Sequence, residues 1–139
     1  MGWKLFKRGK PPDITSIKLW DPHPKYVAGK SYAHALRSGR VTIFGSSIFR
    51  YPTKKWFQSL GSGTCVLADA PLNSDRLGLK DGENYIEINK ENWEEKLKWI
   101  LGNEDERLRI AKNGLRLARE KHTHEVRVKE LLNILEAYS

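Results

Sequence analysis

Short apolar segments alternate with polar, glycine-containing turns across residues 16–90. Four of these segments have the length and composition of strands: 17–20, 41–44, 65–68 and 85–88. The third is apolar at every position, which favours a strand that is buried on both faces. Helical spacing is present at 29–38, which Gly39 ends, and at 52–60, where Pro52 suits the first helical turn.

From Asn92 onward the pattern is helical throughout. Asn92 with Glu95, and Asn103 with Glu106, fit N-caps that are each followed by an acid at the third helical position. Three apolar faces follow at helical spacing: Trp93, Leu97, Ile100 and Leu101; Leu108, Ala111, Leu115 and Ala118; Val128, Leu131, Leu132 and Leu135. We expect three successive helices that pack as a C-terminal cap on a small sheet.

The alternation of strands and helices predicts an α/β fold, with a small Rossmann-like parallel sheet flanked by helices. The 139 residues suit one domain, which we divide into an α/β part at 1–91 and a helical cap at 92–139. A hydrophobic content of 39% is typical of a soluble globular domain.

The formal net charge of +8 is carried by the N-terminal part of the chain. Residues 1–60 contain 12 Lys and Arg against 2 Asp, whereas residues 61–139 contain 13 Lys and Arg against 15 Asp and Glu. An anionic partner is therefore expected on the N-terminal part.

Several classes of protein and site are excluded or disfavoured. No apolar stretch approaches the roughly 18 residues of a membrane helix, and the first residues lack the apolar run of a signal peptide. The single Cys65 excludes an intrachain disulfide and a Cys-rich zinc site, so we expect a reducing, cytoplasmic setting. His122 and His124 do not share a helical face, which favours N-capping around Thr123 over a zinc site.

The most informative segment runs from Lys55 to Asp69 and reads KWFQSLGSGTCVLAD. The pattern predicts a helix that ends in a glycine turn and is followed by a buried strand. Gly61 and Gly63 could simply allow positive φ and close helix–strand packing. The segment is not a dinucleotide-binding fingerprint, because no strand precedes a Gly-x-Gly-x-x-Gly run.

This segment resembles the donor-binding stretch of group 1 GT-B-fold glycosyltransferases, which reads K-x-F-E-A-L-A-C-G-T-P-V-L-A-S/D. Four further segments match that family in order and spacing: 81–86, 92–103, 109–114 and 122–127. The resemblance extends over about residues 30–136.

The resemblance implies a nucleotide-sugar donor site in the C-terminal lobe of a two-lobed transferase. In that family a helix N-terminus and basic side chains face the diphosphate, and a Glu binds the ribose. Transferred to this sequence, the donor-binding residues are Arg50, Lys54, Lys55, Gln58, Ser59, Gly61, Gly63 and Thr64. The donor is a substrate, so no cofactor or metal is implied, and no catalytic residue is assigned.

The sequence departs from the family at two acidic positions: Gln58 replaces the ribose-binding Glu, and Arg50 replaces an acid eight residues earlier. The acceptor lobe is absent, which indicates part of a longer enzyme or a reduced homologue. Two alternative functions stay open: an interaction domain without catalysis, and a basic nucleic-acid-binding module, although the sequence contains no nucleic-acid-binding motif. We also expect self-association, because an incomplete sheet exposes an edge strand.

Overall fold

The computed structural model describes residues 29–138, so the predicted strand at 17–20 lies outside the described residues. Three parallel strands form one sheet in the order β1 (Val41–Phe44), β2 (Cys65–Ala68) and β3 (Ile86–Glu87). β2 is the central strand of this sheet, and all four of its residues are buried, as its continuous apolar pattern predicts. The predicted strand at 85–88 is shorter than expected, since Tyr85 forms an isolated bridge with Asp81.

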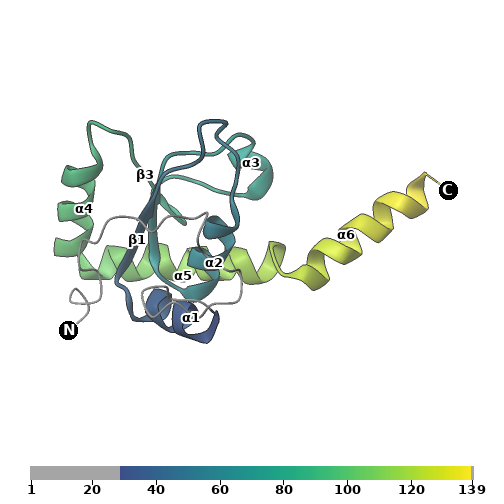
Figure 1. Ribbon diagram of the computed structural model, residues 1–139, viewed down its shortest axis with the longest axis horizontal. Helices are drawn as coiled ribbons and strands as arrows, with labels where there is room; N and C mark the ends of the chain where they lie inside the picture. The colour runs from purple at the N-terminus through teal and green to yellow at the C-terminus, as the bar shows by residue number, and fades with distance from the viewer. Residues whose placement is uncertain (1–28, 139) are drawn as a thin grey trace, which may run out of the picture.

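Helices cover this sheet and continue beyond it: α1 (Gly29–Ser38), α2 (Lys54–Ser62), α3 (Ser74–Leu77), α4 (Trp93–Gly102), α5 (Glu104–Lys121) and α6 (His124–Ala137). The long helix α5 runs along the body of the molecule, and α4 lies beside its N-terminal end (Figure 1). The predicted α/β architecture with a small Rossmann-like parallel sheet is therefore confirmed for the described part of the chain.

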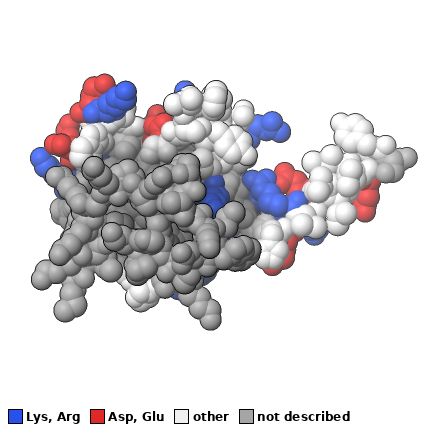
Figure 2. All heavy atoms as spheres, viewed as in Figure 1, with Lys and Arg blue, Asp and Glu red and all other residues white. Residues whose placement is uncertain are grey.

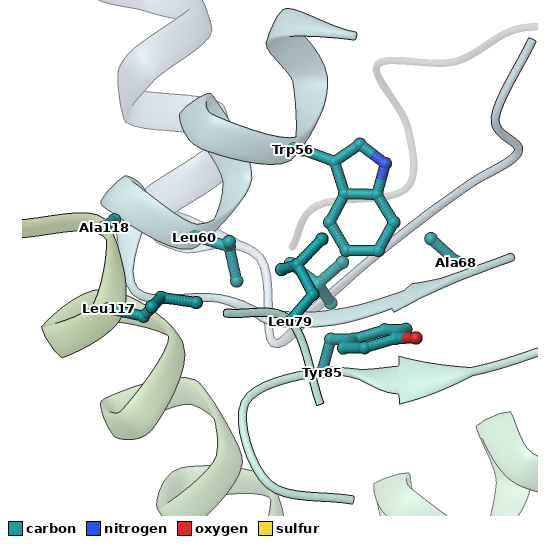
Figure 3. Close-up of a cluster of buried hydrophobic side chains, with 8 residues drawn as sticks. Trp56, Leu60, Ala68, Leu79, Tyr85, Leu117 and Ala118 are labelled. Atoms are coloured by element: carbon teal, nitrogen blue, oxygen red, sulfur yellow. The ribbon is translucent and has the colours of Figure 1, made fainter. Parts of the chain in front are cut away.

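Two apolar clusters fill the two faces of β2. Val66 and Ala68 belong to the cluster that holds Trp56 and Tyr85, whereas Cys65 and Leu67 belong to the other. Trp56 packs edge-to-face on Tyr85, with ring centroids 5.1 Å apart, and Figure 3 shows the two rings among the surrounding aliphatic side chains. Such edge-to-face pairs add specific geometry to the burial of apolar surface, so α2 is fixed against the sheet.

The predicted N-caps have mixed outcomes. Thr123 caps α6, because its Oγ1 accepts a hydrogen bond from the Val126 backbone N–H at 3.4 Å. The side chain of Asn92 instead accepts from the backbone N–H of Asn89, and Asn103 donates to the Trp99 carbonyl. Asn92 and Asn103 do occupy the predicted N-cap positions of α4 and α5, but neither side chain makes the capping hydrogen bond, because the preceding turn and helix take up the amide groups.

The start of α2 also differs from the prediction by two residues. Pro52 precedes the helix, and Thr53 is its N-cap residue with an extended ψ of 162°. The helix also continues two residues beyond the predicted end at Leu60, since it includes Gly61 and Ser62, and it stops within the predicted glycine turn at Gly63, with a φ of 78°.

The last helix does not pack on the sheet. α6 extends away from the body (Figure 1), and Val128, Leu131, Leu132 and Leu135 are each more than half exposed. The expected cap is therefore formed by α4 and α5, while the direction of α6 is set at the turn around His122, whose ring is bonded to the Leu77 carbonyl. Within the described residues no helix combines the length and the apolar character needed to cross a membrane.

Candidate functional site

The carboxyl ends of the three strands lie at one edge of the sheet, which we call the carboxyl edge. Two loops extend from it: residues 45–53 connect β1 to α2, and residues 69–73 connect β2 to α3. The first turn of α2 lies at the same edge because α2 is the next helix after β1 and begins where the loop from that strand ends. In open α/β sheets this edge is where ligands bind.

Hydrogen bonds join these two loops into one unit. The Asp69 carboxylate accepts a hydrogen bond from the backbone N–H of Ser46, and the Ser46 hydroxyl donates to the Asp69 carbonyl at 3.0 Å. Arg50 donates from Nε and Nη2 to the Ala70 carbonyl, at 3.1 and 2.8 Å. The carbonyl of Arg50 in turn accepts from the backbone N–H of Leu72 at 2.8 Å. Arg50 therefore connects the loops through both its side chain and its backbone.

The first turn of α2 concentrates positive charge. Lys54 and Lys55 are exposed and, within residues 29–138, form no ion pair. Their backbone N–H groups are among those that an α-helix leaves without an internal partner, and the helix dipole adds a positive partial charge. This turn can therefore bind an anion through side chains and backbone together.

Two buried polar atoms in the same turn lack a hydrogen-bond partner in the described part of the chain. They are the hydroxyl oxygen of Thr53 and the indole nitrogen of Trp56. Figure 3 shows the indole nitrogen on the side of the ring that faces away from Leu60 and Tyr85. Because buried polar groups are normally paired, these two atoms mark a place where a partner is missing.

A pocket of about 580 Å³ opens at the carboxyl edge. Residues that directly follow the strands line it, including Gly45, Ser46, Asp69 and Asn89, together with Trp93 from α4. Asp69 ends the segment that the sequence analysis singles out, and position alone could have identified Gly45, Ser46 and Asn89, since each follows a parallel strand. Trp93 is 39% exposed, so its ring offers a flat apolar wall for a ligand.

The eight residues predicted to bind the donor fall into separate places. Arg50, Lys54 and Lys55 lie together at the carboxyl edge, whereas Gln58 and Gly61 line a groove of about 360 Å³ between α1 and α2. Lys54 and Gln58 are four residues apart on one helix and therefore share a face of α2. A ligand held at the first turn could extend along this face into the groove.

The other three predicted residues lie at the end of α2 and in the turn that leads to β2. Ser59 and Thr64 are 1% and 2% exposed, and the Thr64 hydroxyl lies 2.8 Å from the Thr42 hydroxyl and 3.3 Å from the Ser59 carbonyl. Gly63 adopts the left-handed conformation that ends the helix. Because burial closes off both hydroxyl groups, neither reaches a ligand in this structure.

Burial keeps two titratable groups of the core, the Tyr85 phenol and the Cys65 thiol, in their neutral forms. Burial, followed by the nearby carboxylates of Glu87 and Asp81, raises the pKa of the Tyr85 phenol well above its usual range. Burial also raises the pKa of the Cys65 thiol to about 11, so this thiol packs in the core and is not poised as a nucleophile. His122 and His124 have different partners, the Leu77 carbonyl and the Glu125 carboxylate.

Comparison with known proteins gives one match. Searches among curated proteins and among solved structures found nothing similar. The sequence model of the glycosyl transferase-like family, however, matches residues 10–133, which include both loops at the carboxyl edge and all of α2. The resemblance to glycosyltransferases seen in the sequence is thus confirmed at the level of the family. Since the match covers most of the length of the chain, the chain belongs to the glycosyl transferase-like family.

Proposed function

We propose that this domain binds a nucleoside diphosphate sugar at the carboxyl edge and takes part in the transfer of the sugar. The observation that carries the proposal is the first turn of α2, where exposed Lys54 and Lys55 meet the open end of a helix. Membership of the glycosyl transferase-like family supports a sugar-transfer reaction. A diphosphate is the part of such a donor that this turn is suited to bind.

The proposed chemistry is electrostatic. When the bond between the anomeric carbon and the diphosphate oxygen breaks, negative charge grows on the departing nucleoside diphosphate and the sugar becomes oxocarbenium-like. Fixed cations and backbone N–H groups at the diphosphate stabilise that charge without having to reorganise. Lys54 and Lys55 supply the cations, and Arg50 holds the two loops in place through the Ala70 carbonyl.

Gln58 takes the proposed role of contacting the ribose. It is exposed, lies one turn from Lys54 on the same helix face and lines the groove between α1 and α2. Its amide can donate to one hydroxyl and accept from another, but it lacks the charge of a carboxylate. We therefore expect the nucleoside to be held more weakly by Gln58 than by a glutamate at this position.

Donor binding can be tested by thermal unfolding of the full chain with uridine or guanosine diphosphate at millimolar concentration. A ligand at about 100 times its Kd stabilises the folded state by about 2.7 kcal/mol, which is a shift of several degrees for a domain of this size. We expect Lys54→Ala/Lys55→Ala to remove this shift. The matched control is Lys98→Ala/Lys112→Ala, which alters two exposed lysines on α4 and α5 and should leave the shift intact. An unshifted wild-type melting temperature with both nucleotides would exclude the proposal.

A second candidate is a donor-binding domain that has lost catalysis. It is favoured by Arg50, which stands where the family has an acid and whose guanidinium is already bound to the Ala70 carbonyl. In this case nucleotide binding persists, but no sugar is transferred even when an acceptor lobe is supplied. Hydrolysis or transfer of a radiolabelled donor separates the two candidates.

A further inference from the structure

Four large apolar side chains project from the loops of the carboxyl edge. Ile48 is 91% exposed, Phe49 76%, Tyr51 66% and Leu72 52%. The first three lie in the loop after β1 and Leu72 lies in the loop after β2, and the hydrogen bond from Leu72 N–H to the Arg50 carbonyl brings them together. We call these four residues the apolar tip.

The apolar tip is held outward by specific bonds. The backbone N–H of Arg50 donates to the Ser47 carbonyl at 2.7 Å, and that of Tyr51 donates to the Ser47 hydroxyl at 3.3 Å. Arg50 itself adopts a φ of 50°, a conformation that residues other than glycine rarely take. The same residue joins the two loops, since its carbonyl accepts from Leu72 and its side chain donates to Ala70, so the bonds between the loops hold this backbone conformation.

The core below the tip is complete without these side chains. Trp56 packs edge-to-face on both Phe44 and Tyr85, with ring centroids 5.2 and 5.1 Å apart, and it is fully buried. The tip is therefore not part of the described core, and its four side chains are exposed.

Cations accompany the apolar tip. Arg50, Lys54 and Lys55 fall within residues 45–60, which contain no acid, and Arg76 lines a hollow together with Leu72. Acids lie on the same side as well. The Asp69 carboxylate accepts the Ser46 N–H, Asp75 lies on α3, and Glu130 lines the same hollow, where it pairs with Arg127 at 2.7 Å. Figure 2 shows largely uncharged atoms at the top of the body, with Lys and Arg side chains to the right of them and acidic atoms to the left.

From this arrangement we propose that the apolar tip docks the domain on the surface of an anionic lipid bilayer. Aliphatic and aromatic side chains favour the boundary between headgroups and acyl chains, and neighbouring lysines and arginines are attracted by anionic headgroups. A bilayer accommodates separate protruding side chains, whereas a protein partner would need a matching hollow for each. The charge and the protrusion of the tip together therefore select a membrane surface as its partner.

Docking in this way would turn the carboxyl edge toward the bilayer. If the edge also binds a nucleotide sugar, the acceptor would be an amphiphile at the membrane surface, and this consequence rests on the proposed function. The docking itself does not depend on donor binding.

The test is co-sedimentation of the full chain with vesicles of phosphatidylcholine containing about 30 mol% phosphatidylglycerol, at low and physiological salt. We expect binding that is weakened by salt and is at least about tenfold weaker with pure phosphatidylcholine. Ile48→Ser/Phe49→Ser should lower the partition coefficient about tenfold or more, and Leu72→Ser from the second loop should lower it in the same direction. The matched control is Leu131→Ser/Leu132→Ser, which changes two leucines of α6 with exposures of 55% and 52% and should leave vesicle binding unchanged.

Two results with the wild type would overturn the proposal: no binding to anionic vesicles, or binding to neutral vesicles that is as strong as binding to anionic ones. Two results with variants would also overturn it. One is a loss of vesicle binding in Leu131→Ser/Leu132→Ser as large as that in Ile48→Ser/Phe49→Ser, and the other is a wild-type dimer that Ile48→Ser/Phe49→Ser dissociates. The nucleotide-induced thermal shift should survive in Ile48→Ser/Phe49→Ser, because these side chains lie outside the proposed donor contacts. A wild-type chain that binds vesicles but shows no thermal shift would refute donor binding alone. A wild-type chain that shows the thermal shift but does not bind vesicles would refute docking alone.

Discussion

A single glycine controls how closely α5 approaches α2. A Cβ atom at Gly114 would lie 2.7 Å from the Leu60 Cδ2 atom and 2.8 Å from the Asn84 carbonyl oxygen. The leucine side chain could move, but the carbonyl belongs to the backbone next to Tyr85. The position therefore requires glycine because of a contact between distant parts of the chain.

Gly114→Ala should lower the free energy of unfolding by about 1–3 kcal/mol, the usual cost of overpacking a well-packed core. Gly61→Ala is the control, since a Cβ there meets nothing within 4 Å. In a helix interior such a change stabilises by up to about 1 kcal/mol. Urea unfolding of both variants measures the difference, and equal stabilities would show that the packing around Gly114 yields at no cost.

The predicted site also changes when its residues are considered one by one. Sequence placed Ser59 and Thr64 beside Lys54 and Gln58, but neighbours on a helix point in different directions. The Thr64 hydroxyl is hydrogen-bonded to Thr42, from a strand more than 15 residues away, and Ser59 is buried beside it. No local pattern contains that contact, so the sequence could not separate exposed from buried members of the motif.

At the scale of elements, the turn between α5 and α6 depends on the protonation of His122. Its Nε2 donates to the Leu77 carbonyl at 2.8 Å, and its Nδ1 accepts from Arg127 Nη2 at 2.8 Å. Only the neutral ring with its proton on Nε2 satisfies both bonds. Burial, with Arg127 and Lys121 nearby, lowers the pKa of His122 below 6.5, although the Leu77 bond and Glu130 oppose the shift.

Because the folded state disfavours protonated His122, its contribution to stability is complete above pH 6.5 and is lost as the pH falls toward the lowered pKa. We expect the free energy of unfolding to fall as the pH drops below about 6.5. His122→Gln, which cannot titrate, should flatten this part of the profile. His124→Gln is the matched control, because His124 is highly exposed, and a profile that His122→Gln leaves unchanged would contradict the assignment.

The cap of α6 offers a second measurement at this scale. Thr123 accepts the Val126 N–H, and replacing an N-cap threonine by alanine costs about 1 kcal/mol. Since α6 makes few contacts with the body, the loss should appear as fraying of α6 rather than as global unfolding. Faster amide hydrogen exchange confined to the first turns of α6 is the expected result, whereas faster exchange throughout the sheet would show that α6 is coupled to the core.

At the scale of the whole molecule, Glu104 connects distant parts of the chain. Its carboxylate is bound by Arg107 on α5 and by Arg40, which directly precedes β1, and Arg107 also donates to the Arg40 carbonyl at 2.9 Å. The hydrogen bonds from Arg107 and then Arg40 lower the pKa of Glu104 to about 2. The start of α5 is thereby fixed to the first described strand.

A carboxylate with a lowered pKa stabilises the folded state above its unfolded value of 4.5, and this contribution is lost as the pH falls toward 2. We expect acid unfolding of Glu104→Gln to depend less on pH in this range than that of the wild type. Glu120→Gln is the control, because Glu120 forms no ion pair within residues 29–138. Parallel acid profiles for Glu104→Gln and the wild type would contradict this role.

Self-association through the sheet edge stays a prediction. β1 and β3 are the two edge strands of the sheet among residues 29–138, and the segment expected to form a further strand, 17–20, lies outside that range. Light scattering of the full chain decides the matter, since a monomer at all concentrations would contradict pairing through this edge.

The sequence alone determined the features that depend on neighbours along the chain. Alternating apolar segments gave the parallel sheet, a continuous apolar run gave the buried central strand β2, and Gly63 ended α2 as expected. These are governed by local periodicity and backbone preference, which any short window of sequence contains.

The tertiary structure alone decided which surfaces meet. It turned α6 away from the sheet through the bonds of His122, buried Ser59 and Thr64, and joined two separate loops through Arg50. Each result depends on contacts between residues far apart in the chain, whose distances are fixed only when the core packs. The charge distribution and the apolar pattern located the segment that contains α2, with lysines at its start and glycines at its end. Packing determined which side chains of this segment reach the surface.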